Sequence, residues 1–162
     1  MRPGKSVDSL DFRILACLQR AGRCSNVDLA EQVGLSPSPC LARVKRLEDN
    51  GFIKSYGAHM ELAKLGDFII VFAEVTMSEH RQRDHQRFEE AVEQCPEVME
   101  CSNVSGGYDY LLKVVVRSVA DYQETMDFLL QADVGIIRFF SYIVLRVPFI
   151  KHEYPLERLF NR

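Results

Sequence analysis

The segment 25–51 (SNVDLAEQVGLSPSPCLARVKRLEDNG) constrains the fold of this chain more than any other stretch. Ser25 is a favoured residue for capping the start of a helix, and Gly34 can take the left-handed backbone conformation that ends one. Ser36 offers a second helix start, and Pro37 suits the first position of that helix because its missing N–H has no partner there. Two short helices joined by a tight corner are typical of a helix-turn-helix, in which the second helix enters a DNA groove.

A third helix is predicted upstream of this pair. Asp8 is a suitable N-cap, and Asp11 adds a negative charge to the first turn, where the helix dipole favours it. Apolar side chains then recur at helical spacing on one face: Leu10, Ile14, Leu15, Cys17 and Leu18. We therefore expect three helices within residues 1–52, forming an N-terminal helix-turn-helix domain.

Charge is distributed unevenly along the chain, although the net charge of the 162 residues is only −3. Residues 1–66 contain ten Lys and Arg against seven Asp and Glu, which gives +3, and residues 67–162 contain ten against sixteen, which gives −6. A polyanion such as DNA would meet the basic front half. The two halves are therefore expected to serve different functions.

The helix that starts at Ser36 carries the basic residues expected to meet DNA. On a helical wheel its apolar side lies opposite a face with small residues near the start and basic residues after them. Small residues permit close approach to a major groove, arginine can read guanine or hold phosphate, and the backbone N–H groups at 36–38 can receive a phosphate. The same pattern also fits a solvated charged helix in any small bundle. The predicted DNA-binding residues are Ser36, Ser38, Pro39, Ala42, Arg43, Lys45 and Arg46.

The second half follows a different pattern, with strands and helices in the order β-α-β-β-α-β. This order gives a four-stranded antiparallel sheet with both helices on one face, the ferredoxin-like arrangement. The predicted fold class is therefore α+β, with a linking strand or extended linker at 53–66 and a second domain at 67–162. The expected strands are 68–77, 98–105, 108–116 and 136–147, and the expected helices are 84–95 and 119–130. Phe128 is among the candidate packing residues of the last helix.

The predicted sheet leaves apolar side chains on the face away from its helices, among them residues of FIIVFAEV and YIVLRV. An uncovered apolar face of that size marks an interface. We expect it to meet the same face of a second chain, which would form a homodimer.

The stretch 105–110 (SGGYDY) is the second unusual feature. Its two glycines expose backbone groups and allow a small polar ligand to approach. Asp109 is suited to hold an ammonium group, and Tyr108 or Tyr110 to cover an apolar side chain. The other interpretation is a plain two-residue hairpin turn at the glycine pair, followed by a strand. On spacing alone, the hairpin is favoured over the ligand site.

Other classes of function find little support in the sequence. Five cysteines without CxxC argue against a disulfide framework, and the four histidines lack the spacing of metal ligands. Reduced thiols are expected, with a redox switch through Cys24, Cys95 or Cys101 as the alternative. No phosphate loop, GxSxG or paired His/Cys signature is present, so we expect no enzyme activity and no cofactor. No apolar run reaches membrane length and the N-terminus lacks a signal-peptide core, so a cytoplasmic protein without membrane contact is expected.

The helix-turn-helix segment and the stretch VSGGYDYLLKV together resemble the Lrp/AsnC family of bacterial and archaeal transcription regulators. The likeness extends from about Asp8 to Tyr154, and the opening VDSLDFRILACLQRAGRCS is similar to the family's first helix. It implies a winged-type helix-turn-helix, a linking strand, and a C-terminal ferredoxin-like (RAM or ACT-like) domain that binds an amino acid. It also implies dimers, often assembled into octamers of four dimers. The segment 146–162 is longer than the family pattern.

The resemblance also implies the positions of two sites. The family's recognition helix corresponds to residues 36–50. Its effector segment corresponds to a glycine-tyrosine-aspartate run in the loop, with positions on the last helix and the last strand nearby. The predicted effector-binding residues are Ser105, Gly106, Gly107, Tyr108, Asp109, Tyr110, Val119 and Tyr142.

The sequence therefore predicts a sequence-specific DNA-binding regulator of amino-acid metabolism whose assembly or DNA affinity responds to a small amino acid. The expected partners are double-stranded DNA, that amino acid and further copies of the chain. A ligand-sensing subunit of a metabolic enzyme would also fit the second domain. RNA binding shares the βαββαβ order but needs an aromatic pattern that Tyr108 and Tyr110 do not reproduce.

Overall fold

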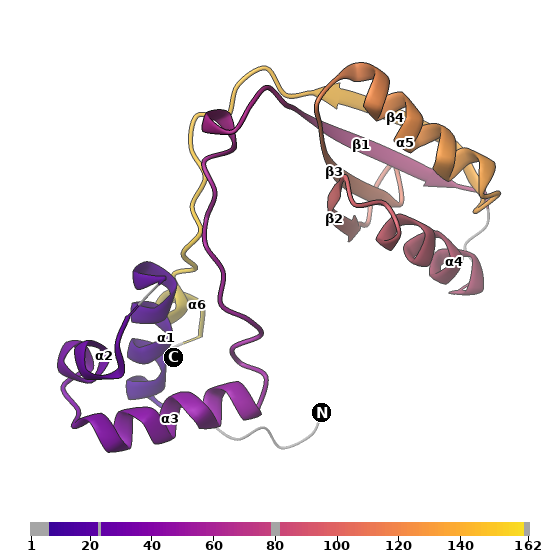
Figure 1. Cartoon of the computed structure of the whole chain (residues 1–162). Coiled ribbons are helices and arrows are strands. Elements are labelled where there is room, and N and C mark those ends of the chain that lie inside the picture. Colours follow the sequence, from indigo (N-terminus) through magenta and orange to yellow (C-terminus); the bar gives the residue numbers. More distant parts are fainter. Residues whose placement is uncertain (1–6, 23, 79–81, 161–162) are drawn as a thin grey trace. The chain divides into compact units, whose positions relative to one another are not determined.

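The computed structural model describes residues 7–22, 24–78 and 82–160. These residues form two compact units (Figure 1). The first contains the described residues up to 60 together with 149–160, and the second contains those within 61–148. The first unit is helical and the second holds a sheet with helices, which confirms the predicted α+β class.

Three helices form most of the first unit: α1 (Ser9–Ala21), α2 (Asn26–Val33) and α3 (Pro37–Asp49). Helices this short are marginal in water on their own, so their shared apolar core stabilises them. Each helix contributes to that core, whose buried members are Ile14, Cys17, Leu29, Ala30, Val33, Cys40 and Leu47.

The ends of these helices follow the predicted start and stop signals. Asp8 accepts a hydrogen bond from the Asp11 backbone N–H at 2.9 Å, and the Asp11 side chain accepts one from the Asp8 N–H at 3.0 Å, so the pair forms a capping box at α1. Ser25 caps α2 through the Asp28 N–H at 3.1 Å. Gly34 ends α2 in the left-handed conformation, with φ at 71°.

The C-terminal segment joins the first unit, which differs from the predicted second domain at 67–162. The short helix α6 (Leu156–Phe160) packs against α1 (Figure 1). Just before it, the Tyr154 N–H donates to Gln19 Oε1 at 2.9 Å, and Gln19 Nε2 donates to the Tyr154 carbonyl oxygen at 3.3 Å. Sequence patterns did not show this because the contact joins residues 135 positions apart.

The linking strand predicted within 53–66 does not form in the described structure of this single chain. Residues 54–61 carry no regular secondary structure, and a 3-10 helix, η1 (Leu62–Lys64), follows them. A lone strand has no neighbour for its backbone N–H and C=O groups, so it cannot form a sheet by itself. The structure therefore agrees with the linker interpretation.

The second unit contains a four-stranded antiparallel sheet with the strand order β2-β3-β1-β4. In the central pair, Ile69 lies opposite Val116 and Val75 lies opposite Tyr110. This confirms the predicted β-α-β-β-α-β order. The elements are β1 (Ile69–Met77), α4 (Gln82–Glu93), β2 (Val98–Asn103), β3 (Tyr110–Val116), α5 (Val119–Gln131) and β4 (Ile136–Ile143).

Both helices cover the same face of the sheet (Figure 1). Alternate residues of β1, from Val71 to Met77, are buried together with Phe88 of α4 and with Met126 and Leu129 of α5. Successive side chains of a strand point to opposite faces, so the other residues of β1 face away from the helices.

The opposite face of the sheet is not covered by any described helix of the second unit. Phe140 and Tyr142 of β4 are 50% and 52% exposed, and Phe72 and Leu111 of the central strands are partly exposed on the same side. We call the residues of this side, including Ile70 and Val115, the outer sheet face. It corresponds to the uncovered apolar face expected from the sequence.

Three predicted details are wrong. The strand predicted at 136–147 ends at Ile143, where the pairing with β1 ends at Val71. The Val144 N–H donates to the Ile70 carbonyl at 2.9 Å, and beyond residue 145 the register would run past the start of β1 at Ile69. The predicted two-residue turn between β2 and β3 is a loop over 104–109. Phe128, expected to pack inside, is 51% exposed.

Candidate nucleic-acid interface and effector loop

One side of α3 is open to solvent. It lies away from Cys40 and Leu47, which are buried in the core of the first unit. A side chain on this side can meet a duplex without disturbing that core. We call the set the α3 outer face, and it contains five of the seven predicted DNA-binding residues: Ser36, Ser38, Pro39, Ala42 and Lys45.

The start of α3 has fewer backbone donors than the sequence prediction assumed. Pro37 and Pro39 have no N–H, and the Cys40 N–H donates to the Ser36 carbonyl at 3.2 Å. This leaves the N–H groups of Ser36 and Ser38 to meet a phosphate. Ser36 makes no side-chain capping bond, because Pro39 at the usual donor position lacks an N–H. Its hydroxyl can therefore face a phosphate instead.

Arg43 and Arg46 point toward α1. Arg43 Nη1 lies 2.7 Å from Asp8 Oδ2 and 2.8 Å from Asp11 Oδ1, and Arg46 Nη2 binds Asp11 Oδ2. The Asp11 side chain is fully buried, while those of Arg43 and Arg46 are 27% and 41% exposed. A buried carboxylate is costly unless it is paired and hydrogen-bonded, and here both guanidinium groups supply that pairing. The two arginines predicted for the DNA surface thus connect α3 to α1.

Asp8, Asp11, Arg43 and Arg46 form a charged cluster. Within it, opposite charges stabilise one another. The Asp11 backbone N–H and the Arg43 guanidinium lower the pKa of Asp8, and Asp8 with Asp11 raises the pKa of Arg43. The sequence prediction used Asp11 only as a first-turn charge and missed this cluster. A signal was present: Asp11 precedes Ile14 by three residues and Leu15 by four, so it shares their apolar helix face.

The loop 104–109 is attached to the end of β1 through Asp109. Asp109 Oδ2 accepts a hydrogen bond from the Met77 N–H at 2.8 Å, and the Asp109 N–H donates to the Val75 carbonyl at 2.9 Å. Gly106 has a φ of 152°, a conformation that favours glycine. Asp109 therefore fixes the shape of the segment predicted to bind the effector.

Tyr110, also predicted for the effector site, belongs to the core between β3 and α4. Its hydroxyl donates to Glu89 Oε1 at 2.7 Å and lies 2.9 Å from His85 Nδ1. Its ring centroid is 4.5 Å from that of Phe88. Burial and the Glu89 carboxylate raise the pKa of Tyr110. Tyr108, in contrast, is partly exposed.

Of the remaining two predicted effector residues, Val119 does not join the loop 104–109 within one chain, whereas Tyr142 lies close enough to Tyr108 of that loop to interact with it electrostatically. Val119 begins α5, at the opposite end of β3 from the loop, and is 48% exposed. Tyr142 lies opposite Phe72 on the outer sheet face, where its hydroxyl donates to Glu74 Oε2 at 3.2 Å. The predicted effector residues are therefore distributed along the sheet.

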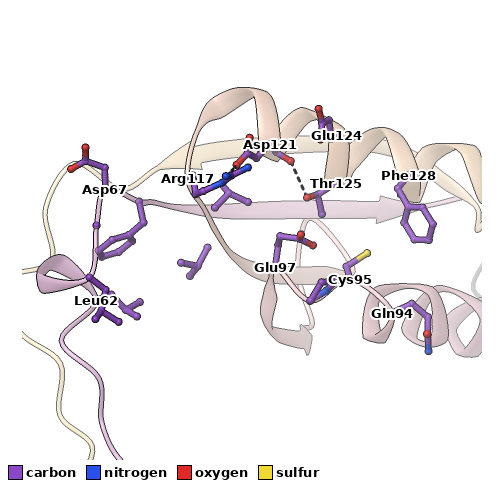
Figure 2. A pocket seen from close by; sticks show the side chains of 16 residues that line it. Leu62, Asp67, Gln94, Cys95, Glu97, Arg117, Asp121, Glu124, Thr125 and Phe128 are labelled. Atoms are coloured by element: carbon purple, nitrogen blue, oxygen red, sulfur yellow. Dashed lines mark hydrogen bonds and ion pairs between the residues drawn. The ribbon is translucent and has the colours of Figure 1, made fainter.

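A groove of about 750 Å³ lies elsewhere in the second unit, and none of the eight predicted effector residues lines it. In Figure 2, the walls of the groove include the segment that holds η1, the end of β3 and the helix α5. Two of the residues that line the groove form an ion pair, in which Arg117 Nε donates to Asp121 Oδ2 at 3.0 Å. Its lining also includes apolar and acidic side chains, among them Leu62, Asp67, Glu97, Glu124 and Phe128.

The described residues contain no group of three or more His, Cys, Asp or Glu that could hold a metal ion. All five cysteines are free thiols. No helix in the described part of the chain is long and apolar enough to cross a membrane.

Two family descriptions match successive parts of the chain. Residues 7–54 match a winged helix-turn-helix DNA-binding domain, and residues 70–153 match the Lrp/AsnC ligand binding domain. The leucine-responsive regulatory protein of Escherichia coli (strain K12) is 44% identical over 125 residues, which cover 77% of this chain and 76% of that protein.

Solved structures give the same result over nearly the whole length. An AsnC family transcriptional regulator from Agrobacterium tumefaciens has a TM-score of 0.86 at 32% identity, and the matched part covers 95% of this chain and 100% of that protein's chain. A transcriptional regulator from Neisseria meningitidis, solved as a complex with L-Met, has a TM-score of 0.85 at 32% identity, and the matched part covers 96% of this chain and 100% of that one. With these matches, the chain belongs to the Lrp/AsnC family.

Proposed function

We propose that this chain is a sequence-specific DNA-binding regulator of amino-acid metabolism, and that an amino acid modulates its assembly or its affinity for DNA. The observation that carries the proposal is the α3 outer face. It presents small side chains and Lys45 to solvent, on a helix-turn-helix whose core is closed behind them. The relatives that support the proposal are regulators and not enzymes.

DNA binding is tested by selecting duplexes from a random-sequence pool with the full chain and measuring affinity at several salt concentrations. A specific regulator selects a shared motif and binds it on the order of 10³-fold or more tightly than an unselected duplex. Affinity for both duplexes should fall as salt rises, because phosphate contacts release counterions. Absence of binding to any duplex at low salt would refute the proposal and favour the alternative of an enzyme's sensing subunit.

The loop 104–109 is the proposed contact for the amino acid. One structural relative was solved with L-Met, and in this chain the partly exposed Tyr108 lies on a loop that Asp109 fixes to β1. A ligand that binds only the folded state stabilises it by RT ln(1 + [L]/Kd). Thermal-shift measurements with each of the twenty amino acids should therefore single out the effector.

A pair of variants locates that effector. We expect Tyr108→Ala to weaken binding of the responsive amino acid about tenfold or more, the effect of losing about 1.4 kcal/mol. Phe128→Ala, at the groove of Figure 2, is the matched control and should bind it as the wild type does. If Phe128→Ala loses the response while Tyr108→Ala keeps it, the ligand binds in the groove and the loop assignment is wrong. Asp109 is less suitable for this test because it also holds Met77.

We further propose that two chains pair through the outer sheet face and that such dimers assemble further, up to octamers, in the cytoplasm. The half-exposed rings of Phe140 and Tyr142 support the pairing, because an apolar surface of this kind is rarely left open to water.

A further inference from the structure

We infer that Arg43 and Arg46 are positioning residues: they hold α3 against α1 through Asp11, while the α3 outer face reads the DNA. The inference rests on the proposed DNA-binding function and assigns separate tasks to the basic residues of α3. It replaces the expectation that either arginine reads guanine.

The first argument is that the carboxylate of Asp11 is fully engaged. Its Oδ1 accepts from Arg43 Nη1 at 2.8 Å, and its Oδ2 accepts from Arg46 Nη2 and from the Asp8 N–H. The side chain has no exposed surface, so its hydrogen bonds are made to protein groups and not to bulk water while both guanidinium groups are in place. Withdrawing either guanidinium would leave a buried carboxylate short of a charged partner.

The second argument is the direction of the two guanidinium groups. Reading guanine through two hydrogen bonds requires two N–H groups of one arginine to point out of the protein into the groove. Arg43 shares its Nη1 between Asp8 and Asp11, and Arg46 directs its Nη2 at Asp11. The end of each guanidinium that faces Asp11 is therefore not available to a base while this contact is kept.

The third argument is that another basic residue already occupies the open side of α3. Lys45 is exposed, and it follows Ser38 and Ala42 at the spacing i, i+4, i+7 that places all three on one helix face. A lysine ammonium suits phosphate as a point charge, and the two small side chains before it permit close approach to bases.

Two neighbouring substitutions of the same kind separate these tasks. Arg46→Gln and Lys45→Gln each remove one positive charge from α3 in the full-length chain. Three quantities are measured for each variant. They are the thermal midpoint, the ratio of its affinity for a duplex selected by the wild type to its affinity for an unselected duplex, and the slope of log affinity against log salt concentration.

Arg46→Gln should lower the thermal midpoint by about 2 °C or more, since a chain of about 150–250 residues shifts by about 2–4 °C per kcal/mol. It should leave the salt slope unchanged while reducing the preference for the selected duplex. Lys45→Gln should keep the midpoint within about 1 °C and reduce the salt slope by about one, as expected for a lost phosphate contact. Arg46→Lys keeps the charge without the planar guanidinium group, so its thermal midpoint should lie between those of the wild type and Arg46→Gln.

Asp11→Asn provides the decisive comparison, because this buried side chain cannot reach a duplex. It should reduce the preference for the selected duplex as Arg46→Gln does, and the double variant should lose no more than the larger single loss. The inference is wrong if Arg46→Gln lowers the salt slope by about one at an unchanged midpoint while Asp11→Asn binds as the wild type does. Failure of the wild type to bind any duplex would refute the proposed function itself, and the assigned reading residues with it.

Discussion

Single side chains at the start of α1 carry out more than one task. Asp8 caps the helix through its Oδ1, which accepts the Asp11 N–H, and its Oδ2 pairs with Arg43 at 2.7 Å. Asparagine caps a helix about as well as aspartate but has no charge. The substitution Asp8→Asn therefore removes the ion pair while the cap is retained.

The ion pair of Asp8 should appear in the pH dependence of stability. Because the fold lowers the pKa of Asp8 below its ordinary value of 3.8, its charge stabilises the fold above that value, and this contribution is lost as the pH falls through the lower folded pKa. We expect the wild type to be more stable than Asp8→Asn at neutral pH and the difference to vanish in strong acid. Thermal unfolding of both proteins from neutral to acidic pH measures it. A difference that is equally large at the acidic end would exclude the charge as its cause.

Cys101 should react slowly in spite of its exposed position. Desolvation of the thiol and the nearby Glu89 carboxylate raise the pKa of Cys101 to about 11. The thiolate is the reactive form, so about one thiol in a thousand is reactive at about pH 8, and the rate should rise about tenfold per pH unit up to the pKa. Alkylation by iodoacetamide, followed by mass spectrometry, measures this rate. Glu89→Gln should accelerate it, and fast alkylation of the wild type near neutral pH would revive the redox-switch alternative.

At the scale of the elements, the corner between α2 and α3 sets the direction of the recognition helix. Gly34 ends α2 at a φ of 71°, and the next N–H, of Leu35, donates back to the Ala30 carbonyl at 2.8 Å. Asn26 Nδ2 donates to the Pro37 carbonyl at 2.7 Å, which ties the start of α2 to the start of α3. The corner is thus held by backbone conformation as well as by side chains.

Gly34→Ala should destabilise the chain by about 1 kcal/mol, because an alanine in the left-handed region brings its Cβ close to the backbone. The added Cβ would have ordinary space, 4.0 Å from Arg13 Nη2, so the cost arises from conformation and not from a clash. Urea unfolding measures the change. Gly57→Ala is the control, since Gly57 has open space and no left-handed φ, and it should be close to neutral. Equal effects of the two substitutions would contradict the conformational account.

At the scale of the whole molecule, the chain combines a helical unit with a sheet unit, and within the described residues of the sheet unit no helix covers one side of the sheet. The helix-facing side is a closed core built from β1, β3, α4 and α5. The outer sheet face presents Phe140 and Tyr142 beside the partly exposed Phe72. Association of two chains would remove these rings from water, which is the favourable term in most protein association.

Phe140→Glu should prevent this association. The substitution removes an apolar ring and places a carboxylate opposite Glu74 of β1, where like charges repel. Loss of a central aromatic residue costs about 2 kcal/mol or more, about 30-fold in the dimer dissociation constant. Sedimentation equilibrium over a range of protein concentrations measures that constant. Phe149→Glu introduces the same change at an exposed phenylalanine of the first unit and should leave it unchanged. A wild type that is monomeric throughout would refute the pairing.

Local rules were sufficient for much of this structure. Asp8 and Ser25 start helices, Gly34 ends one, and the strand and helix order of the second unit follows from periodicity. Each of these signals acts within a few residues, through a cap, a left-handed glycine or the period of side chains along an element. Helical spacing also placed Ser38 and Ala42 on the exposed side of α3, because it determines which residues share a face.

Only the tertiary structure decided where the charged and aromatic site residues point. Arg43 and Arg46 turn to a buried carboxylate that is 32 and 35 residues away, and Tyr110 joins Glu89 of α4 instead of the effector loop. A helical wheel places such side chains on a face but contains nothing about the partner that approaches it. Long polar side chains follow the nearest buried opposite charge or acceptor, and that group is brought within reach only when the elements pack.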